Sequence, residues 1–91
     1  MNITVIGAGN MGGALIKGWA KTGKHSLTIT ARTEQTLSRF RNDFPNIKTS
    51  LDNVKAVKGA DVIVLAVKPW LIEEVIMQIR DSINFDEQRI L

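Results

Sequence analysis

Residues 5–12, Val5-Ile6-Gly7-Ala8-Gly9-Asn10-Met11-Gly12, decide the fold of this chain. They connect the apolar, β-branched run from Asn2 to Ile6, which predicts a strand, to the segment from Asn10 to Thr22, which predicts a helix. The glycines in this turn follow the spacing G-x-G-x-x-G. Such a pattern alone is weak evidence, but here it follows a strand, opens a helix and lies within a strand-helix-strand unit of about thirty residues, the context in which it binds a pyrophosphate.

Each of the three glycines in the G-x-G-x-x-G turn is required for a different physical reason. Gly7 permits the tight bend, Gly9 leaves the phosphates free of an obstructing side chain, and Gly12 lets the helix pack closely on the strand. The free N–H groups and the positive end of the helix dipole then face the phosphates. Two other interpretations stay open: a glycine turn that only connects strand to helix, and an Asn10 side chain that caps the helix instead of contacting a ligand.

Strand-like and helix-like segments alternate along the rest of the sequence and predict an α/β fold, a Rossmann-like doubly wound parallel sheet. The β-branched run from Asp61 to Val67 belongs near the middle of this sheet. Arg89-Ile90-Leu91 reads as a fifth strand cut short, which would leave the run from Asp61 to Val67 without an outer neighbour. The remaining expected elements are strands at 26–31 and 47–49 and helices that begin at Thr33, after a cap at Ser50, and at Pro69.

Apolar side chains at helical spacing indicate which residues of each helix face the core. The expected stripes, in chain order, are Met11, Ala14, Leu15, Gly18 and Trp19; Leu37, Phe40 and Phe44; Leu51, Val54 and Val57; and Ile72, Val75, Ile76, Ile79 and Ile83.

The composition of the chain restricts its function class. Apolar residues make up 44% and charged residues 23% of the 91 residues, which is ordinary for a single globular domain. The net charge is +3, but Lys and Arg are scattered, so nucleic-acid binding is not expected. No cysteine is present, which excludes disulfides and thiolate metal sites, and no metal site is expected. The absence of a signal peptide or a membrane span predicts a cytoplasmic protein.

The end of the second predicted strand bears on cofactor choice. NAD-specific domains place an acidic residue there, about twenty positions after the glycine turn, to accept from the ribose 2′-hydroxyl. This chain has Arg32 and Thr33 instead. A guanidinium forms a charge-assisted pair of hydrogen bonds with a 2′-phosphate, so NADPH is predicted in preference to NADH. The alternative is a solvated Arg32, with Glu34 reaching back to the ribose.

These segments together resemble the N-terminal half of the pyrroline-5-carboxylate reductase family. The resemblance rests on three stretches, Val5 to Ala14, Ala31-Arg32-Thr33, and Asp61 to Pro69, the last of which ends in Ala-Val-Lys-Pro. It implies that Ala66, Val67, Lys68 and Pro69 lie at the ribose and nicotinamide end of the cofactor. It also implies that Ile6 to Met11 line the pyrophosphate, that Arg32 meets the adenosine phosphate, and that Asn53 approaches the adenosine.

The resemblance also implies what the 91 residues do not contain. Its members carry a C-terminal helical domain that forms a dimer and completes the pocket for the imine substrate. We therefore expect residues 1–91 to be the dinucleotide-binding domain alone, inactive by itself, from a homo-oligomeric enzyme that reduces 1-pyrroline-5-carboxylate to L-proline. No catalytic acid, base or nucleophile is predicted, and the single histidine, His25, falls at the wrong end of its strand.

Two other functions fit the same residues. One is a different NADP-dependent oxidoreductase, such as the coenzyme F420-dependent type, because the glycine turn and Arg32 are shared with it. The other is a non-enzymatic module that senses a nucleotide.

Overall fold

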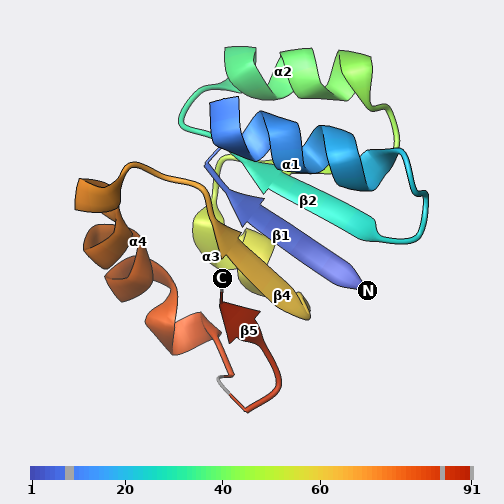
Figure 1. Cartoon of the computed structure of the whole chain (residues 1–91). Coiled ribbons are helices and arrows are strands. Elements are labelled where there is room, and N and C mark those ends of the chain that lie inside the picture. Colours follow the sequence, from blue (N-terminus) through green and yellow to red (C-terminus); the bar gives the residue numbers. More distant parts are fainter. Residues whose placement is uncertain (8–9, 85, 91) are drawn as a thin grey trace.

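The computed structural model of the chain describes residues 1–7, 10–84 and 86–90, and it forms a five-stranded, all-parallel sheet covered by helices (Figure 1). The strands are β1 (Asn2–Ile6), β2 (Ser26–Thr30), β3 (Lys48–Ser50), β4 (Val62–Leu65) and β5 (Arg89–Ile90). The helices are α1 (Asn10–Ala20), α2 (Glu34–Asp43), α3 (Asn53–Val57) and α4 (Ile72–Ile79), with single 3-10 turns at Pro69–Leu71 and Arg80–Ser82.

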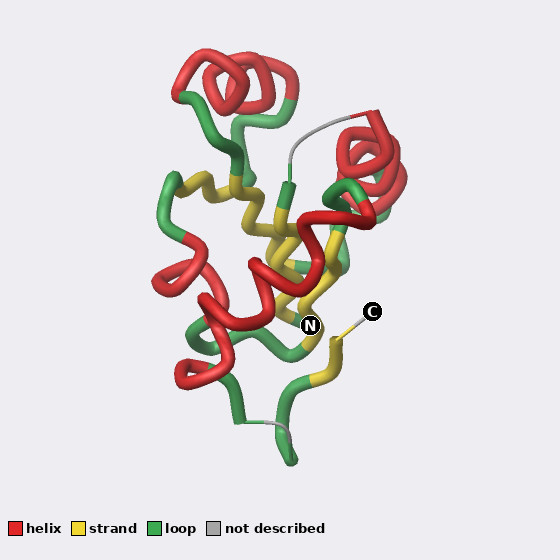
Figure 2. The backbone as a smooth tube through the Cα atoms, turned by 90° about the vertical axis from the view of Figure 1, so that its left-hand side faces the viewer, coloured by secondary structure: helices red, strands yellow, loops and turns green. Residues whose placement is uncertain are grey.

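The strand order β3-β2-β1-β4-β5 confirms the predicted doubly wound topology. Helices α1 and α2 cover one face of the sheet, and α3 and α4 cover the other (Figures 1 and 2). Each face has its own buried cluster. Ile16 of α1 and Leu37 of α2 pack with Val5 on one side, whereas Val57 of α3 and Ile79 of α4 pack with Ile63 on the other. None of the helices in the described ranges is long and apolar enough to cross a membrane.

The buried face of α1 differs from the predicted stripe. Ile16, which was not assigned to the stripe, is fully buried, while Ala14 and Gly18 are exposed. Leu15 and Trp19 pack at the border of the cluster as predicted. The prediction was wrong because several phases of a helix this rich in small apolar residues satisfy the same spacing, and only the position of the sheet selects the one centred on Ile16.

The predicted cap of α3 was also wrong. The Asp52 carboxylate caps this helix, since its Oδ1 accepts from the backbone N–H of Val54 (2.9 Å) and of Lys55 (3.3 Å). Ser50 instead bonds with the backbone of Asp52 in the preceding turn. Helix α3 therefore begins later than expected, and Leu51 lies before it with 56% of its surface exposed.

Strand β5 gives β4 an outer neighbour along part of its length. Val62 pairs with Arg89 and Ile63 with Ile90, and within the described residues the ladder stops there. The expectation that β4 would have no outer neighbour was therefore wrong for its first half, whereas the prediction of a strand beginning at Arg89 is confirmed.

The Gln88 side chain joins the segment just before β5 to the end of α3 and the turn that follows it. Its Nε2 donates to the carbonyl oxygens of Val57 (2.8 Å) and Ala60 (2.7 Å), and its Oε1 accepts from the Asn84 N–H (2.9 Å). The two bonds to carbonyl groups are partly buried. The Val57 carbonyl also accepts from the Ala60 N–H (3.2 Å), so losing the Gln88 donor leaves the Ala60 carbonyl without a partner among the described residues. We expect Gln88→Leu to lower the free energy of unfolding by about 1 to 3 kcal/mol.

Urea denaturation measures this loss. The matched control is Gln35→Leu, because Gln35 is exposed on α2 and makes no side-chain hydrogen bond with the described residues. Equal losses in the two variants would contradict the assigned role of Gln88.

Candidate functional site

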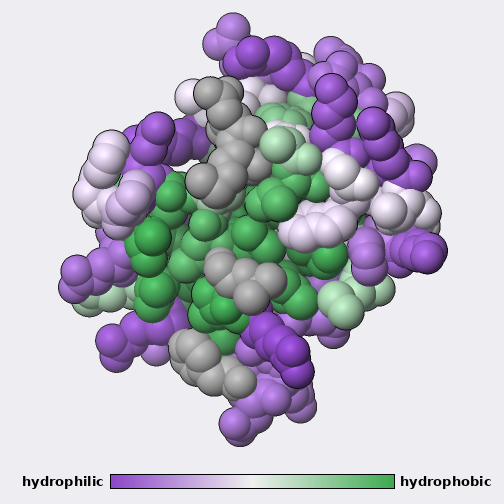
Figure 3. Space-filling view, viewed as in Figure 1, coloured by the Kyte–Doolittle hydropathy of each residue, from purple (hydrophilic) through white to green (hydrophobic). Residues whose placement is uncertain are grey.

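A large open groove runs along the carboxyl ends of the strands, where ligands of open parallel sheets bind. Its volume is about 1360 Å³, more than a drug-sized ligand needs. The space-filling view shows hydrophobic residues gathered in the middle of the molecule and hydrophilic residues around them (Figure 3). The predicted site residues that line the groove are Ile6, Gly7, Arg32, Thr33, Asn53, Ala66, Val67, Lys68 and Pro69. Four separate segments of the sequence therefore meet at one edge of the sheet.

Gly7 holds two of these segments together. It has a φ of +100°, a conformation that side chains disfavour. A Cβ placed on Gly7 would lie 2.8 Å from Val67 Cγ1 and 2.9 Å from the Ala66 carbonyl oxygen. The Ala66 N–H donates to the Ile6 carbonyl oxygen (2.9 Å) at the same point. Position 7 is therefore restricted to glycine both by its backbone and by the close approach of the segment after β4.

The structure describes the glycine turn only in part. Ala8 and Gly9 lie outside the described residues. Asn10, Met11 and Gly12 open α1, whose first turn lies beyond the carboxyl end of β1 (Figure 1). The N–H groups of this first turn are those that a helix cannot use internally.

Arg32 lies two residues after the end of β2 and is exposed on the rim of the groove. Its guanidinium makes no hydrogen bond or ion pair with any side chain in the described part of the protein. A cation at this point is available to a ligand in the groove.

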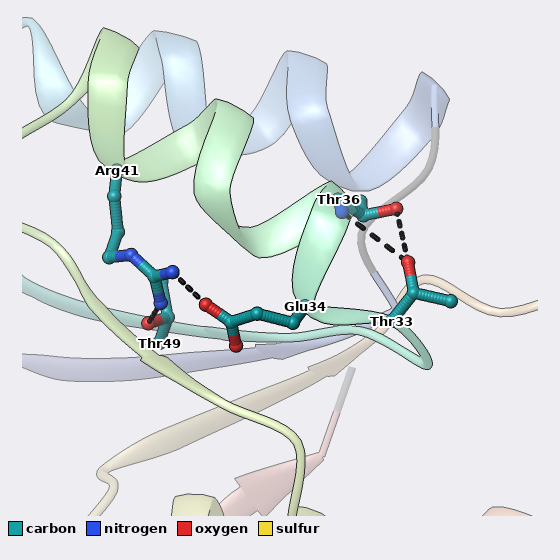
Figure 4. Close-up of polar contacts among 5 residues, drawn as sticks. All are labelled: Thr33, Glu34, Thr36, Arg41 and Thr49. Atoms are coloured by element: carbon teal, nitrogen blue, oxygen red, sulfur yellow. Dashed lines mark hydrogen bonds and ion pairs between the residues drawn. The ribbon is translucent and has the colours of Figure 1, made fainter.

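Thr33 caps α2, whose first residue is Glu34. Its Oγ1 accepts from the Thr36 N–H (3.3 Å) and shares a 3.0 Å hydrogen bond with the Thr36 hydroxyl (Figure 4). Thr36 also lines the groove and was not predicted as a site residue. The signal for it was present, because a hydroxyl residue three positions after the cap lies on the same side of the helix.

Glu34 is turned away from the groove. Its carboxylate forms an ion pair with Arg41 at the other end of α2, and Arg41 Nη1 also donates to Thr49 Oγ1 of β3 (2.8 Å; Figure 4). Glu34 is not one of the residues that line the groove. The arrangement differs from the alternative in which Glu34 reaches back to a ribose.

Asn53 lies on the opposite wall, at the start of α3. Its Nδ2 donates to Gln78 Oε1 of α4 (2.9 Å), so the two helices are joined across this wall. Sequence reasoning missed Glu74 and Gln78, which line the groove one helical turn apart on α4. It also missed Leu51 and Met77, two exposed apolar residues that line the groove.

Among the residues that the structure describes, no group of three or more His, Cys, Asp or Glu side chains is placed to hold a metal ion. His25 precedes β2 and so lies at the end of the strand away from the groove, as predicted. The groove is lined by cationic and amide side chains, which suit binding of a polyanionic ligand, and by one carboxylate, that of Glu74 on α4.

A doubly wound sheet, a glycine turn and a groove at the carboxyl ends of the strands define the class of the protein: a domain with the Rossmann-like fold. The chain belongs to the family described as NADP oxidoreductase coenzyme F420-dependent, whose model matches residues 2–89.

Individual relatives agree with the predicted resemblance. The chain is 35% identical over 91 residues to a pyrroline-5-carboxylate reductase of Vibrio alginolyticus, covering 98% of this chain and 33% of the relative. A solved pyrroline-5-carboxylate reductase of Coxiella burnetii superposes with a TM-score of 0.85 at 34% identity, covering 92% of this chain and 32% of the other. A Plasmodium falciparum pyrroline carboxylate reductase solved with NADP bound shares the fold, with a TM-score of 0.73, 21% identity, and coverage of 99% and 32%.

The chain spans about one third of the length of these relatives. The comparisons therefore concern one part of a longer enzyme in each case.

Proposed function

We propose that the groove binds NADPH. The observation that carries the proposal is the Arg32 guanidinium, which lies on the rim of the groove after β2 with no hydrogen-bond or ion-pair partner among the described side chains, while Glu34, two positions later in the chain, pairs with Arg41. Arg32 would contact the 2′-phosphate, with the Thr33 and Thr36 hydroxyls beside it. The glycine at position 7 is consistent with the tight turn from β1 into α1, because its φ of +100° and the close approach of Ala66 and Val67 leave no room for a side chain.

The remaining cofactor contacts follow from the segments that meet in the groove. The first turn of α1 and the residues from Ile6 to Gly12 would hold the pyrophosphate, and Asn53 would lie at the adenosine. The segment from Ala66 to Pro69 would lie along the ribose and nicotinamide. Bound NADPH supplies a hydride, and the domain's own residues supply its position.

For the complete enzyme, we propose reduction of the C=N bond of 1-pyrroline-5-carboxylate to give L-proline. The support is the name of relatives at 34% and 35% identity. Because this chain spans about one third of them, we propose that it is the cofactor domain and that a further domain supplies the substrate pocket and a homo-oligomeric interface. A cytoplasmic location stays a prediction.

A second candidate is another NADP-dependent oxidoreductase, including one that uses coenzyme F420. The observation in its favour is the family model, which covers residues 2–89 and carries that description. The groove residues described above belong to the cofactor side, so both candidates predict the same NADPH binding. A nucleotide-sensing module would share it too and would differ in having no turnover.

Arg32→Ala tests the proposed cofactor preference. A hydrogen bond to a charged group contributes about 1.5 to 3 kcal/mol, so NADPH should bind about ten- to a hundredfold more tightly than NADH, and the variant should lose this preference. Titration calorimetry at fixed ionic strength measures both affinities. Arg39→Ala is the matched control, since Arg39 is exposed on α2 and does not line the groove. An unchanged ratio in Arg32→Ala would contradict the proposal.

A further inference from the structure

We propose that Arg41 is a positioning residue for cofactor selection, which acts by holding Glu34 out of the groove. The inference rests on the proposed NADPH site. It concerns residues that do not themselves touch the cofactor.

The place of Glu34 in the sequence makes it a competitor of Arg32. Glu34 is the first residue of α2, next to Thr33 and two positions after Arg32, both of which line the groove. An acid at the end of the second strand accepts from a ribose 2′-hydroxyl and repels a 2′-phosphate. Glu34 therefore has the chemistry of an NADH-selecting residue and lies within a side chain's reach of the NADPH-selecting one.

The structure shows what removes this competition. Arg41 lies seven residues after Glu34, on the same side of α2, and its guanidinium binds the Glu34 carboxylate (Figure 4). The guanidinium is itself fixed from the other side, because it donates to the Thr49 hydroxyl of β3 at 2.8 Å. Figure 4 shows the Glu34 side chain directed along α2 toward Arg41 and away from the Thr33 and Thr36 hydroxyls.

The Arg41–Glu34 ion pair is too exposed to be explained by a contribution to the stability of the fold. The side chains of Arg41 and Glu34 are 43% and 59% exposed. Ion pairs this open to solvent contribute little to the free energy of folding. Breaking the pair should therefore leave the fold intact and free the Glu34 side chain to sample rotamers that face the groove.

The expected effect of Arg41→Met is a change in cofactor preference. A free carboxylate within one Debye length of the 2′-phosphate, about 10 Å at 0.1 M salt, should weaken NADPH binding about three- to tenfold at low salt. NADH should bind equally well or more tightly, because a released Glu34 can accept from its 2′-hydroxyl. The change should shrink at high salt.

A double-mutant cycle with Glu34→Gln identifies the cause. If Arg41 acts through Glu34, the Arg41→Met variant loses NADPH affinity, and Arg41→Met combined with Glu34→Gln regains it. If Arg41 acts through its own positive charge, the loss persists in the double variant and the inference is overturned. An unchanged ratio of NADPH to NADH affinity in Arg41→Met overturns it as well.

Two further measurements keep the result interpretable. Thr49→Val removes one anchor of the guanidinium without touching either charge and should shift the ratio in the same direction by a smaller amount. Circular dichroism and thermal unfolding should show all variants folded. Equal binding of NADPH and NADH by the unmodified protein would instead defeat the NADPH proposal, an outcome distinct from failure of the Arg41 cycle.

Discussion

The 91-residue chain is expected to bind NADPH and yet to show no measurable reduction of 1-pyrroline-5-carboxylate. Hydride transfer needs the donor and acceptor carbons held about 3 to 3.5 Å apart, and orientation of this kind is worth an effective concentration of roughly 10⁵ M or more. The proposed role of the groove residues concerns the cofactor only. Binding and turnover should therefore separate in this chain.

A fusion to a relative tests the same idea from the other side. The chain matches one third of the Vibrio alginolyticus reductase, so the remaining two thirds of that enzyme can be joined after Leu91. NADPH oxidation in the presence of 1-pyrroline-5-carboxylate is then measured for the chain, the fusion and the intact relative. Turnover by the chain alone would contradict its assignment as a cofactor domain. A folded fusion that binds NADPH and ignores this substrate would favour the other oxidoreductase.

Gly7→Ala is expected to destabilise the fold and abolish cofactor binding together. The new Cβ would lie under 3.0 Å from both Val67 and the Ala66 carbonyl, at a φ of +100°. Backbone strain and overpacking of this kind cost about 2 to 5 kcal/mol in total, which for a chain of this size lowers the melting temperature by about 10 °C or more. The segment from Ala66 to Pro69 would also have to move, and it forms one wall of the groove.

Gly18→Ala is the matched control for this substitution. Gly18 lies in α1, is exposed, and has open space where a Cβ would go. Alanine there should raise the free energy of unfolding by about 0.5 to 1 kcal/mol through its better helix propensity. Thermal unfolding and NADPH titration report both effects. A Gly7→Ala variant as stable as the original would show that the close approach to Ala66 relaxes easily.

Sequence reasoning could predict the topology, because alternating strand and helix patterns leave few arrangements of a parallel sheet. It could not predict the rotation of α1, since the buried Ile16 and the exposed Gly18 both fit helical spacing. The cap of α3 was missed for a related reason: Ser50 and Asp52 are both good caps, and only the path of the chain after β3 decides between them.

Some residues of the candidate site could likewise be predicted from the sequence, and others could not. The residues of the glycine turn and Arg32 could be named from local patterns with a known chemistry. Gln78 and Glu74 could not, because they reach the groove only through the packing of α4 against α3. The direction of the Glu34 side chain depends on Arg41, which is in turn bound to Thr49. The contact between Arg41 of α2 and Thr49 of β3 is a tertiary contact, which a local sequence pattern does not predict.

The hydrogen bond from the Gly7 N–H to the buried Thr30 hydroxyl (3.3 Å) sets a boundary for redesign of cofactor preference. Residues 32–34 can be exchanged together if a capping hydroxyl is kept at position 33, because the residue after β1 is anchored at Thr30, before the first exchanged position. An exchange that began at position 30 would remove this hydrogen bond and disturb the glycine turn, whichever cofactor the domain is designed to bind. Engineers who wish to convert the domain to NADH should therefore place the first junction after Ala31.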